Sequence, residues 1–110
     1  MTGVLLAHTA PASPDVVEEF NRWYDEVHVP EVIAKVPGVV AARRFVLAAD
    51  QLLPEEALPD RGYLAIYEIE GEPIEKVAAS LGGGLSDGTL TLSPTLHPDQ
   101  GPLLVFYGAT

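Results

Sequence analysis

The spacing of apolar residues along this chain alternates between a strand pattern and a helix pattern, with no linker between the segments. Four short apolar runs are rich in β-branched and aromatic residues, as strands are. Two other stretches repeat apolar residues about every 3.6 positions, as an amphipathic helix does. The predicted strands are 3–9, 39–47, 63–69 and 103–107, and the predicted helices are 13–28, with a further turn at 30–36, and 72–81. This β-α-β-β-α-β order predicts an α+β, ferredoxin-like fold with one antiparallel sheet.

Proline and glycine residues mark the expected ends of the two helices. Residues 13–15 (Ser-Pro-Asp) begin the first helix with an N-cap, a proline in the first turn and an acid. Pro30 disfavours helical geometry at Val29, so we expect this helix to end or kink directly after His28. The three glycines at 82–84 are expected to end the second helix.

The predicted strands are apolar on both faces. In the first strand, Val4 and Leu6 alternate with Leu5 and Ala7, so neither set is polar. Two helices suffice to cover only one face of a four-stranded sheet, so the other face needs a partner. We expect a homodimer formed through the uncovered face, burying roughly 2,000 Å² or more.

Composition limits the class of protein and its partners. A chain of 110 residues is expected to form one domain, 1–110, and its 47% apolar content suffices for a core without staples. The absence of cysteine excludes disulfides, thiolate metal sites and cysteine nucleophiles. The net charge of −10 argues against nucleic acid or an anionic membrane as partner. With no basic region at the start and no apolar run of membrane length, we expect a cytoplasmic protein.

Residues 21–31 (NRWYDEVHVPE) gather the only Trp, a Tyr and a His near the end of the first predicted helix. Trp23 and Tyr24 fall on the apolar stripe of that helix, and His28 lies on the border of the stripe. A His held at a helix break beside aromatic rings is a candidate for the mouth of a pocket. The alternative is a His that only caps its helix.

The expected core lies between the helices and the sheet. It should contain apolar side chains from both helices and from two of the strands. The expected members are Phe20, Trp23 or Tyr24, Val27, Val39, Leu64, Ile66, Val77 and Leu81.

The motif FNRWYDEVHVPEVIAKVPGVVAARRF, followed by YLAIYEIEG, resembles the dimeric α+β barrel superfamily and most closely its EthD-type members. Those members share a helix that ends in an aromatic, acid and His pattern, then a Pro-Gly and a strand. The resemblance covers residues 3–70 and implies two ferredoxin-like sheets paired into a barrel, with a pocket inside each protomer. The superfamily includes polyketide cyclases, lactone isomerases, cofactor-free monooxygenases, haem-dependent enzymes and proteins of unknown role. His28 matches the family's helix-end His.

Two strand residues add candidate acid/base and oxyanion-binding groups. His8 lies on the same strand face as Leu6, and a His near its ordinary pKa exchanges protons at neutral pH. Arg43 and Arg44 point to opposite faces, and an Arg inside a pocket, Arg44 here, would bind a carboxylate or stabilise an enolate. The alternatives are a His8 exposed at a strand end and two arginines that pair with surface acids.

Aromatic side chains complete the candidate substrate site. Tyr63 and Tyr67 share one face of the third strand, four residues apart. Their phenols would orient a substrate carbonyl or simply pack, and Trp23 would offer an apolar wall. Tyr24 is a further candidate for holding a developing enolate.

The chain lacks the sequence motifs of phosphate-binding loops and of metal sites. The glycines within 81–85 follow a helix and do not open one, so no phosphate-binding loop is expected. The nearest approach to a metal site is Asp25-Glu26 with His28, but consecutive acids project to different sides of a helix. We therefore expect no metal and no cofactor. Haem occurs in the resembling superfamily, and the small aromatic content gives it little support here.

Two classes of function follow. The first is a cofactor-independent enzyme that moves a proton on a hydrophobic, aromatic or polyketide-like molecule, in a cyclisation, isomerisation or dehydration. His28 would be the acid/base, with Tyr24 or Tyr67 and Arg44 holding the enolate. Cofactor-free oxygenation is a variant, because an enolate in a dry pocket reacts with dioxygen. The second class is a noncatalytic ligand-binding or assembly module that uses the same pocket.

Overall fold

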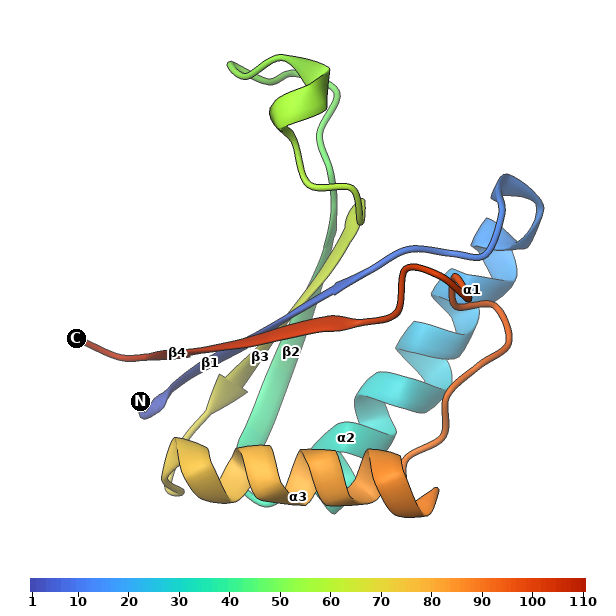
Figure 1. The fold of residues 1–110 in the computed structure, drawn as a ribbon. Helices are drawn as coiled ribbons and strands as arrows, with labels where there is room; N and C mark the ends of the chain where they lie inside the picture. Colours follow the sequence, from blue (N-terminus) through green and yellow to red (C-terminus); the bar gives the residue numbers. More distant parts are fainter.

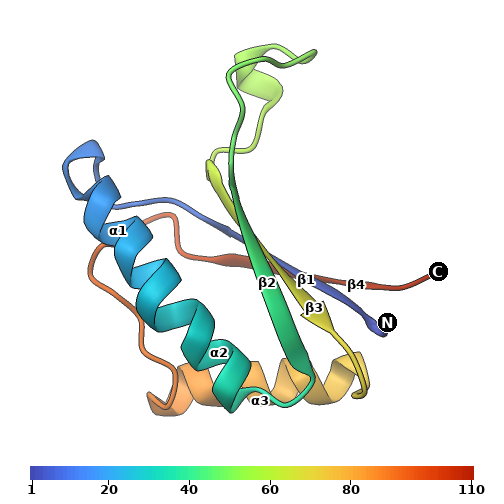
Figure 2. The same ribbon diagram turned by 180° about the vertical axis from the view of Figure 1, so that it is seen from behind.

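Four antiparallel strands form one sheet in the order β2-β3-β1-β4, and the helices lie on one of its faces (Figures 1 and 2). The computed structural model describes all residues, 1–110. The strands are β1 Gly3–Thr9, β2 Val39–Val46, β3 Tyr63–Ile69 and β4 Leu103–Gly108, and the α-helices are α1 Val17–Trp23, α2 Val29–Lys35 and α3 Ile74–Asp87. The predicted α+β, ferredoxin-like class is confirmed. No helix has both the length and the apolarity needed to cross a membrane.

The first helix does not end at His28. A π-helical turn, η2 (Tyr24–His28), joins α1 to α2, and the Val29 N–H bonds the Tyr24 carbonyl five residues earlier. Of the two predicted alternatives, an end after His28 is wrong, whereas the predicted further turn at 30–36 is present as α2. A proline inside a regular α-helix lacks the N–H for the ladder and clashes with the carbonyl four residues before it. The wider π-turn lies directly before Pro30 and lets the helix continue past it.

The π-turn also decides which face of this helix is buried. The buried positions Phe20, Tyr24, His28, Val32 and Val36 are each four residues apart. In a regular α-helix, steps of four overshoot a full turn by about 40° each, so such a stripe would spiral away from the sheet. A π-turn holds more residues and reduces this drift.

One expected core residue of this helix is exposed as a result. Val27 was expected in the core and is instead 44% exposed, while its neighbour His28 is buried. The expectation assumed a regular helical period through η2. Trp23 is partly buried, and Tyr24 takes the fully buried place of that pair.

α3 continues through the three glycines expected to end it. It ends at Asp87, and Gly88 caps it in the left-handed conformation, with φ of 81°. Gly84 has a packing role, because a Cβ at this position would lie 2.9 Å from the Leu90 side chain. Glycine inside a helix costs about 1 kcal/mol relative to alanine, which packing of this kind offsets.

The core lies between the helices and one face of the sheet. Phe20, Val39, Val77 and Leu81 are buried there, as predicted, together with Leu5, Ala65 and Ile69 from the central strands. Leu64 and Ile66 were expected in this core but lie on the opposite face of β3 and are only partly buried. Side chains alternate along a strand, and the helix-covered set in β3 is the one that contains Ala65 and Tyr67.

The face of the sheet opposite the helices, here called the open face, is largely apolar and uncovered. Residues directly opposite in antiparallel strands point to the same side, so the pairing register defines this face. Its apolar members are Val4, Leu6, Ala41, Phe45, Leu64, Ile66, Leu103, Val105 and Tyr107, and its polar members are His8, Arg43 and Glu68.

The burial of Phe20 and the exposure of Val27 give a matched pair of substitutions in one helix. Phe20→Ala should lower the free energy of unfolding by about 3–5 kcal/mol, because it empties a packed aromatic site. Val27→Ala should change it by less than about 1 kcal/mol, as a surface substitution does. Urea denaturation monitored by circular dichroism measures both values. Equal losses in the two variants would contradict the π-turn.

Candidate functional site

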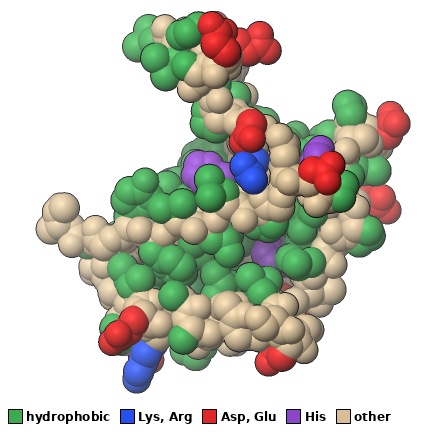
Figure 3. Space-filling view, in the orientation of Figure 1, with side chains coloured by type: hydrophobic (Ala, Val, Ile, Leu, Met, Phe, Trp, Pro, Cys, Tyr) green, Lys and Arg blue, Asp and Glu red, His purple; other side chains and the backbone are tan.

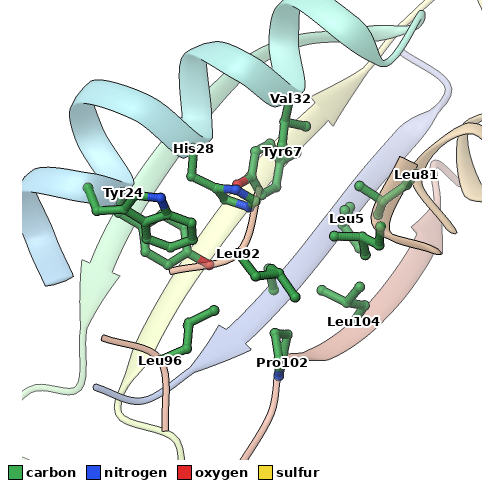
Figure 4. A pocket seen from close by; sticks show the side chains of 13 residues that line it. Leu5, Tyr24, His28, Val32, Tyr67, Leu81, Leu92, Leu96, Pro102 and Leu104 are labelled. Atoms are coloured by element: carbon green, nitrogen blue, oxygen red, sulfur yellow. The ribbon is translucent and has the colours of Figure 1, made fainter. Parts of the chain in front are cut away.

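A narrow pocket lies between the continuous helix, the sheet, α3 and the irregular segment Thr89–Pro102, here called the strap (Figure 4). Apart from a few aromatic and imidazole groups, its walls are aliphatic. The lining residues are Leu5, Ala7, Trp23, Tyr24, His28, Val32, Tyr67, Leu81, Leu85, Leu92, Leu96, Pro102 and Leu104. The space-filling view shows hydrophobic side chains gathered between the strands and α3 (Figure 3).

The pocket is nearly closed. The space between its lining atoms is about 410 Å³, including its opening to solvent, but the centre of a water molecule reaches only about 30 Å³. One water needs roughly 10–15 Å³ on the second measure, so the closed pocket holds about two waters. An aromatic ligand therefore requires one of the walls to move.

The π-turn directs His28 into this pocket and surrounds it with aromatic rings. The His28 ring stacks on Trp23 at a centroid distance of 4.6 Å and meets the edge of the Tyr24 ring at 5.2 Å. A ring held on two sides has little rotational freedom. His28 does not cap its helix, since no capping hydrogen bond from its side chain is present.

His28 carries a buried acceptor or donor without a partner. Its Nδ1 atom has no hydrogen-bond partner and no solvent contact. Burial lowers the pKa of His28 below its ordinary value of 6.5. The negative charge of Glu31 and a hydrogen bond to the Thr91 backbone act in the opposite direction and raise this pKa, but by less. At neutral pH the ring is therefore uncharged and able to accept a proton.

Tyr67 presents the second unpaired polar atom. It reaches the pocket from β3, is 2% exposed, and its hydroxyl has no hydrogen-bond partner. Burial raises the pKa of Tyr67 far above its usual value, and the nearby Tyr24 phenol adds to the rise. Tyr67 is thus a hydrogen-bond donor at any physiological pH. The close-up view shows Tyr67 and His28 both turned into the pocket (Figure 4).

Tyr24 forms the wall between this pocket and Arg44. Burial raises the pKa of Tyr24, and a hydrogen bond with the Thr9 side chain opposes the rise. The Arg44 guanidinium lies 4.4 Å from the centre of the Tyr24 ring, a cation–π arrangement. Arg44 also donates to the Asp25 carboxylate at 3.1 Å and to the Asn21 side-chain oxygen at 2.8 Å. The structure therefore places Arg44 on the helix-covered face but outside the pocket.

Two other candidate residues lie away from this pocket. His8 is on the open face, where it borders a shallow cleft with Phe45 and Leu64. Tyr63 packs edge-on against Phe20 at 5.1 Å and lines a separate cleft with Arg44. Of the predicted site residues, the structure brings together His28, Tyr24, Trp23 and Tyr67. No group of three or more His, Asp and Glu side chains is placed to hold a metal ion.

The sequence indicates that the Pro-rich stretch 93–102 could close a pocket, but sequence reasoning missed the residues that fix the strap to α2. The Glu31 carboxylate accepts from the Thr91 N–H at 2.6 Å, and the Lys35 ammonium donates to the Thr89 carbonyl at 2.9 Å. The backbone bond from Thr91 lowers the pKa of Glu31. The position of Glu31, one helical turn after His28, was the available signal, because residues three apart are neighbours on a helix.

The roof of the pocket is a single layer of strap side chains. Leu92 and Leu96 line the pocket, and Leu92 is also about half exposed to solvent. Beyond Leu92 two backbone hydrogen bonds fix the strap to the segment after β1. The Ala12 N–H donates to the Thr95 carbonyl, and the His97 N–H donates to the Ala10 carbonyl. The strap has no helix or strand of its own, so its movement would break no helix or sheet ladder.

Comparison with known proteins supports the fold but identifies no activity. No protein-family model matches the chain, and no curated protein matches it. Among solved structures, an EthD-like protein from Ralstonia eutropha JMP134 is similar, with a TM-score of 0.60 and 12% sequence identity over 98% of this chain and 92% of that one. The predicted EthD-type resemblance is thus confirmed at the level of the fold, which identifies no reaction.

Proposed function

We propose that the pocket binds a small, hydrophobic, uncharged carbonyl compound and catalyses proton transfer at the carbon beside the carbonyl, without a cofactor. One observation carries this proposal: two residues that line an apolar pocket each bury a polar atom without a partner in the protein, His28 its Nδ1 and Tyr67 its hydroxyl. Buried polar groups in folded proteins are nearly always paired. A carbonyl oxygen of the ligand would accept a hydrogen bond from the Tyr67 hydroxyl, and an acidic proton of the ligand would face His28 Nδ1.

The two groups have complementary protonation states for this chemistry. Neutral His28 takes the proton from the carbon beside the carbonyl, and the Tyr67 hydroxyl donates a hydrogen bond to the oxygen, where negative charge develops. The imidazolium then returns the proton to a different position of the enolate, which completes an isomerisation. Attack by the enolate carbon on a second carbonyl of the same molecule would instead close a ring, and the imidazolium would give its proton to the alkoxide that forms.

The surroundings favour an uncharged ligand. Arg44 contacts the Tyr24 ring and is already paired with Asp25. The lining carries no Lys or Arg that would bind a carboxylate. In this proposal Arg44 is a positioning residue that holds Tyr24 in place, and Trp23 holds the His28 ring by stacking.

Hydrogen–deuterium exchange on a neutral ketone that carries an aromatic ring tests the proposal. With 2-tetralone in D₂O, the protein should accelerate deuterium uptake at the carbon between ring and carbonyl, followed by proton NMR. His28→Gln should lower the protein's contribution about 10²–10⁴-fold, the usual contribution of a general base. Tyr67→Phe should lower it about 10²–10³-fold, as removal of one oxyanion donor does. Because the pKa of His28 is lowered, the rate should fall only below pH 6.5.

His8→Gln is the matched control, because this histidine lies on the open face, away from the pocket. Its exchange rate should equal that of the unmodified protein. If the ketone binds by native mass spectrometry but exchanges no faster than in buffer, the pocket belongs to a noncatalytic binding module. An unchanged rate in His28→Gln would contradict the assignment of the base.

We further propose that two copies of the chain pair through the open face. The supporting observation is its run of apolar side chains on all four strands, which no helix covers. A sheet with an uncovered apolar face is an interaction surface. The pairing would form a barrel from two sheets and leave the proposed pocket inside each protomer.

Sedimentation at micromolar concentration tests the pairing. The unmodified protein should sediment as a dimer. Leu6 and Val105 lie opposite each other on the open face, so the double variant Leu6→Glu/Val105→Glu should be a monomer, because it would bury two like-charged carboxylates. Val27→Glu, on the exposed side of the helix, should remain a dimer. A monomeric unmodified protein would contradict the proposal.

A further inference from the structure

The hairpin connection between β2 and β3, residues 47–62, projects away from both layers of the domain and is here called the arm (Figures 1 and 2). It is ordered by its own bonds: the Leu47 N–H bonds the Gly62 carbonyl at its base, and a 3₁₀ turn, Glu55–Ala57, lies near its end. None of its residues is buried. The arm therefore has a defined shape but contributes nothing to the core of its own protomer.

The end of the arm carries two adjacent apolar side chains that are largely exposed. Leu52 is fully exposed and Leu53 is 59% exposed. Figure 3 shows hydrophobic and acidic side chains together at this end. Full burial of a leucine is worth about 1.5–3 kcal/mol relative to exposure, so two adjacent exposed leucines on an ordered arm favour a contact outside the protomer.

The apolar surface of the arm is continuous with the open face. A cleft at the base of the arm is lined by His8, Phe45 and Leu64 from the open face and by Leu47 and Pro59 from the arm. A molecule seated on the open face would therefore meet the arm as well.

The area of the open face shows why a second contact is needed. Four strands of about seven residues form a surface of roughly 19 by 23 Å, or about 440 Å² on each protomer, from the usual strand spacing and rise. Two such faces contribute about 900 Å² before surface roughness is counted. Stable interfaces bury about 1,200–2,000 Å², and obligate dimers more. Before roughness is counted, the open faces alone fall short of an obligate dimer and of the roughly 2,000 Å² expected from the sequence.

We infer that the arm closes over a second copy of this chain, with Leu52 and Leu53 seated on the partner, so that two arms complete the interface that the open faces begin. This inference rests on the proposed pairing of the open faces. In a two-fold symmetric dimer each protomer places its arm on the other, so the contact made by Leu52 and Leu53 occurs twice. The charges on the open face and on the arm are complementary, which favours a second copy of this chain as the partner. Arg43 on the open face has no ion pair within its protomer, and the arm carries Glu55 and Glu56.

The test compares two arm variants of the full chain by sedimentation over a range of concentrations. Leu52→Asp/Leu53→Asp should raise the dimer dissociation constant at least 100-fold, while circular dichroism stays unchanged because the arm is outside the core. Ala49→Asp adds charge to the arm without removing an apolar side chain and should change the constant less than threefold. A Leu52→Asp/Leu53→Asp protein that dimerises as tightly as the unmodified protein would overturn the inference and leave the open-face dimer standing.

The absence of cysteine from the chain permits a direct second measurement. A single Leu52→Cys substitution places a thiol at a fully exposed position of the protomer. In the dimer, its alkylation by a maleimide should be at least tenfold slower than that of an Ala49→Cys thiol. Equal rates would overturn the inference. If the unmodified protein is a monomer, the inference fails together with the open-face dimer, whereas ketone exchange in the pocket is a separate result.

Discussion

The continuous helix that runs from Val17 to Lys35 must keep one face on the sheet over five helical turns, and the rest of the site depends on how it does so. Its buried residues are spaced four apart, which a regular α-helix cannot hold on one line. The π-turn at Tyr24–His28 takes up part of the mismatch, and Pro30 follows it without breaking the helix. As a consequence His28, and not Val27, enters the interior.

Once inside, His28 meets an environment that determines its chemistry. The Trp23 ring holds the imidazole on one face, and burial keeps it uncharged. Tyr67 reaches the same pocket from the sheet with its proton retained. An unpaired base and an unpaired donor in an apolar pocket are costly to the folded state, about 1–3 kcal/mol for each unmade hydrogen bond. In the proposed function, a bound carbonyl compound would give both groups a hydrogen-bond partner.

The sequence was sufficient where the signal was local. β1 and β3 begin and end at the predicted residues, since Gly3 and the aromatic-rich run from Tyr63 mark them clearly. His28, Tyr24, Trp23 and Tyr67 were all named as candidates, and the structure gathers them in one pocket. The resemblance to EthD-type proteins pointed to the same helix-end His.

Features that depend on helical or strand register, or on contacts between distant residues, could not be predicted from the sequence. A π-turn has no strong sequence signature, so the position of Val27 was wrong, and strand parity misplaced Leu64 and Ile66. The contact of Glu31 with Thr91 joins residues sixty positions apart. The sequence did not decide which of the two arginines faces the helices, and Arg44, expected inside the pocket, lies outside it, bonded to Asp25 and Asn21.

The central claim, that His28 is an uncharged base inside the closed pocket, is tested most directly by ¹⁵N NMR titration of the histidine side chains. The His28→Gln variant assigns the resonances. We expect the His28 ring to titrate below pH 6.5, with both ring nitrogens showing the neutral form at pH 7. A ring that titrates at or above pH 6.5, as an exposed or ion-paired histidine does, would contradict the account.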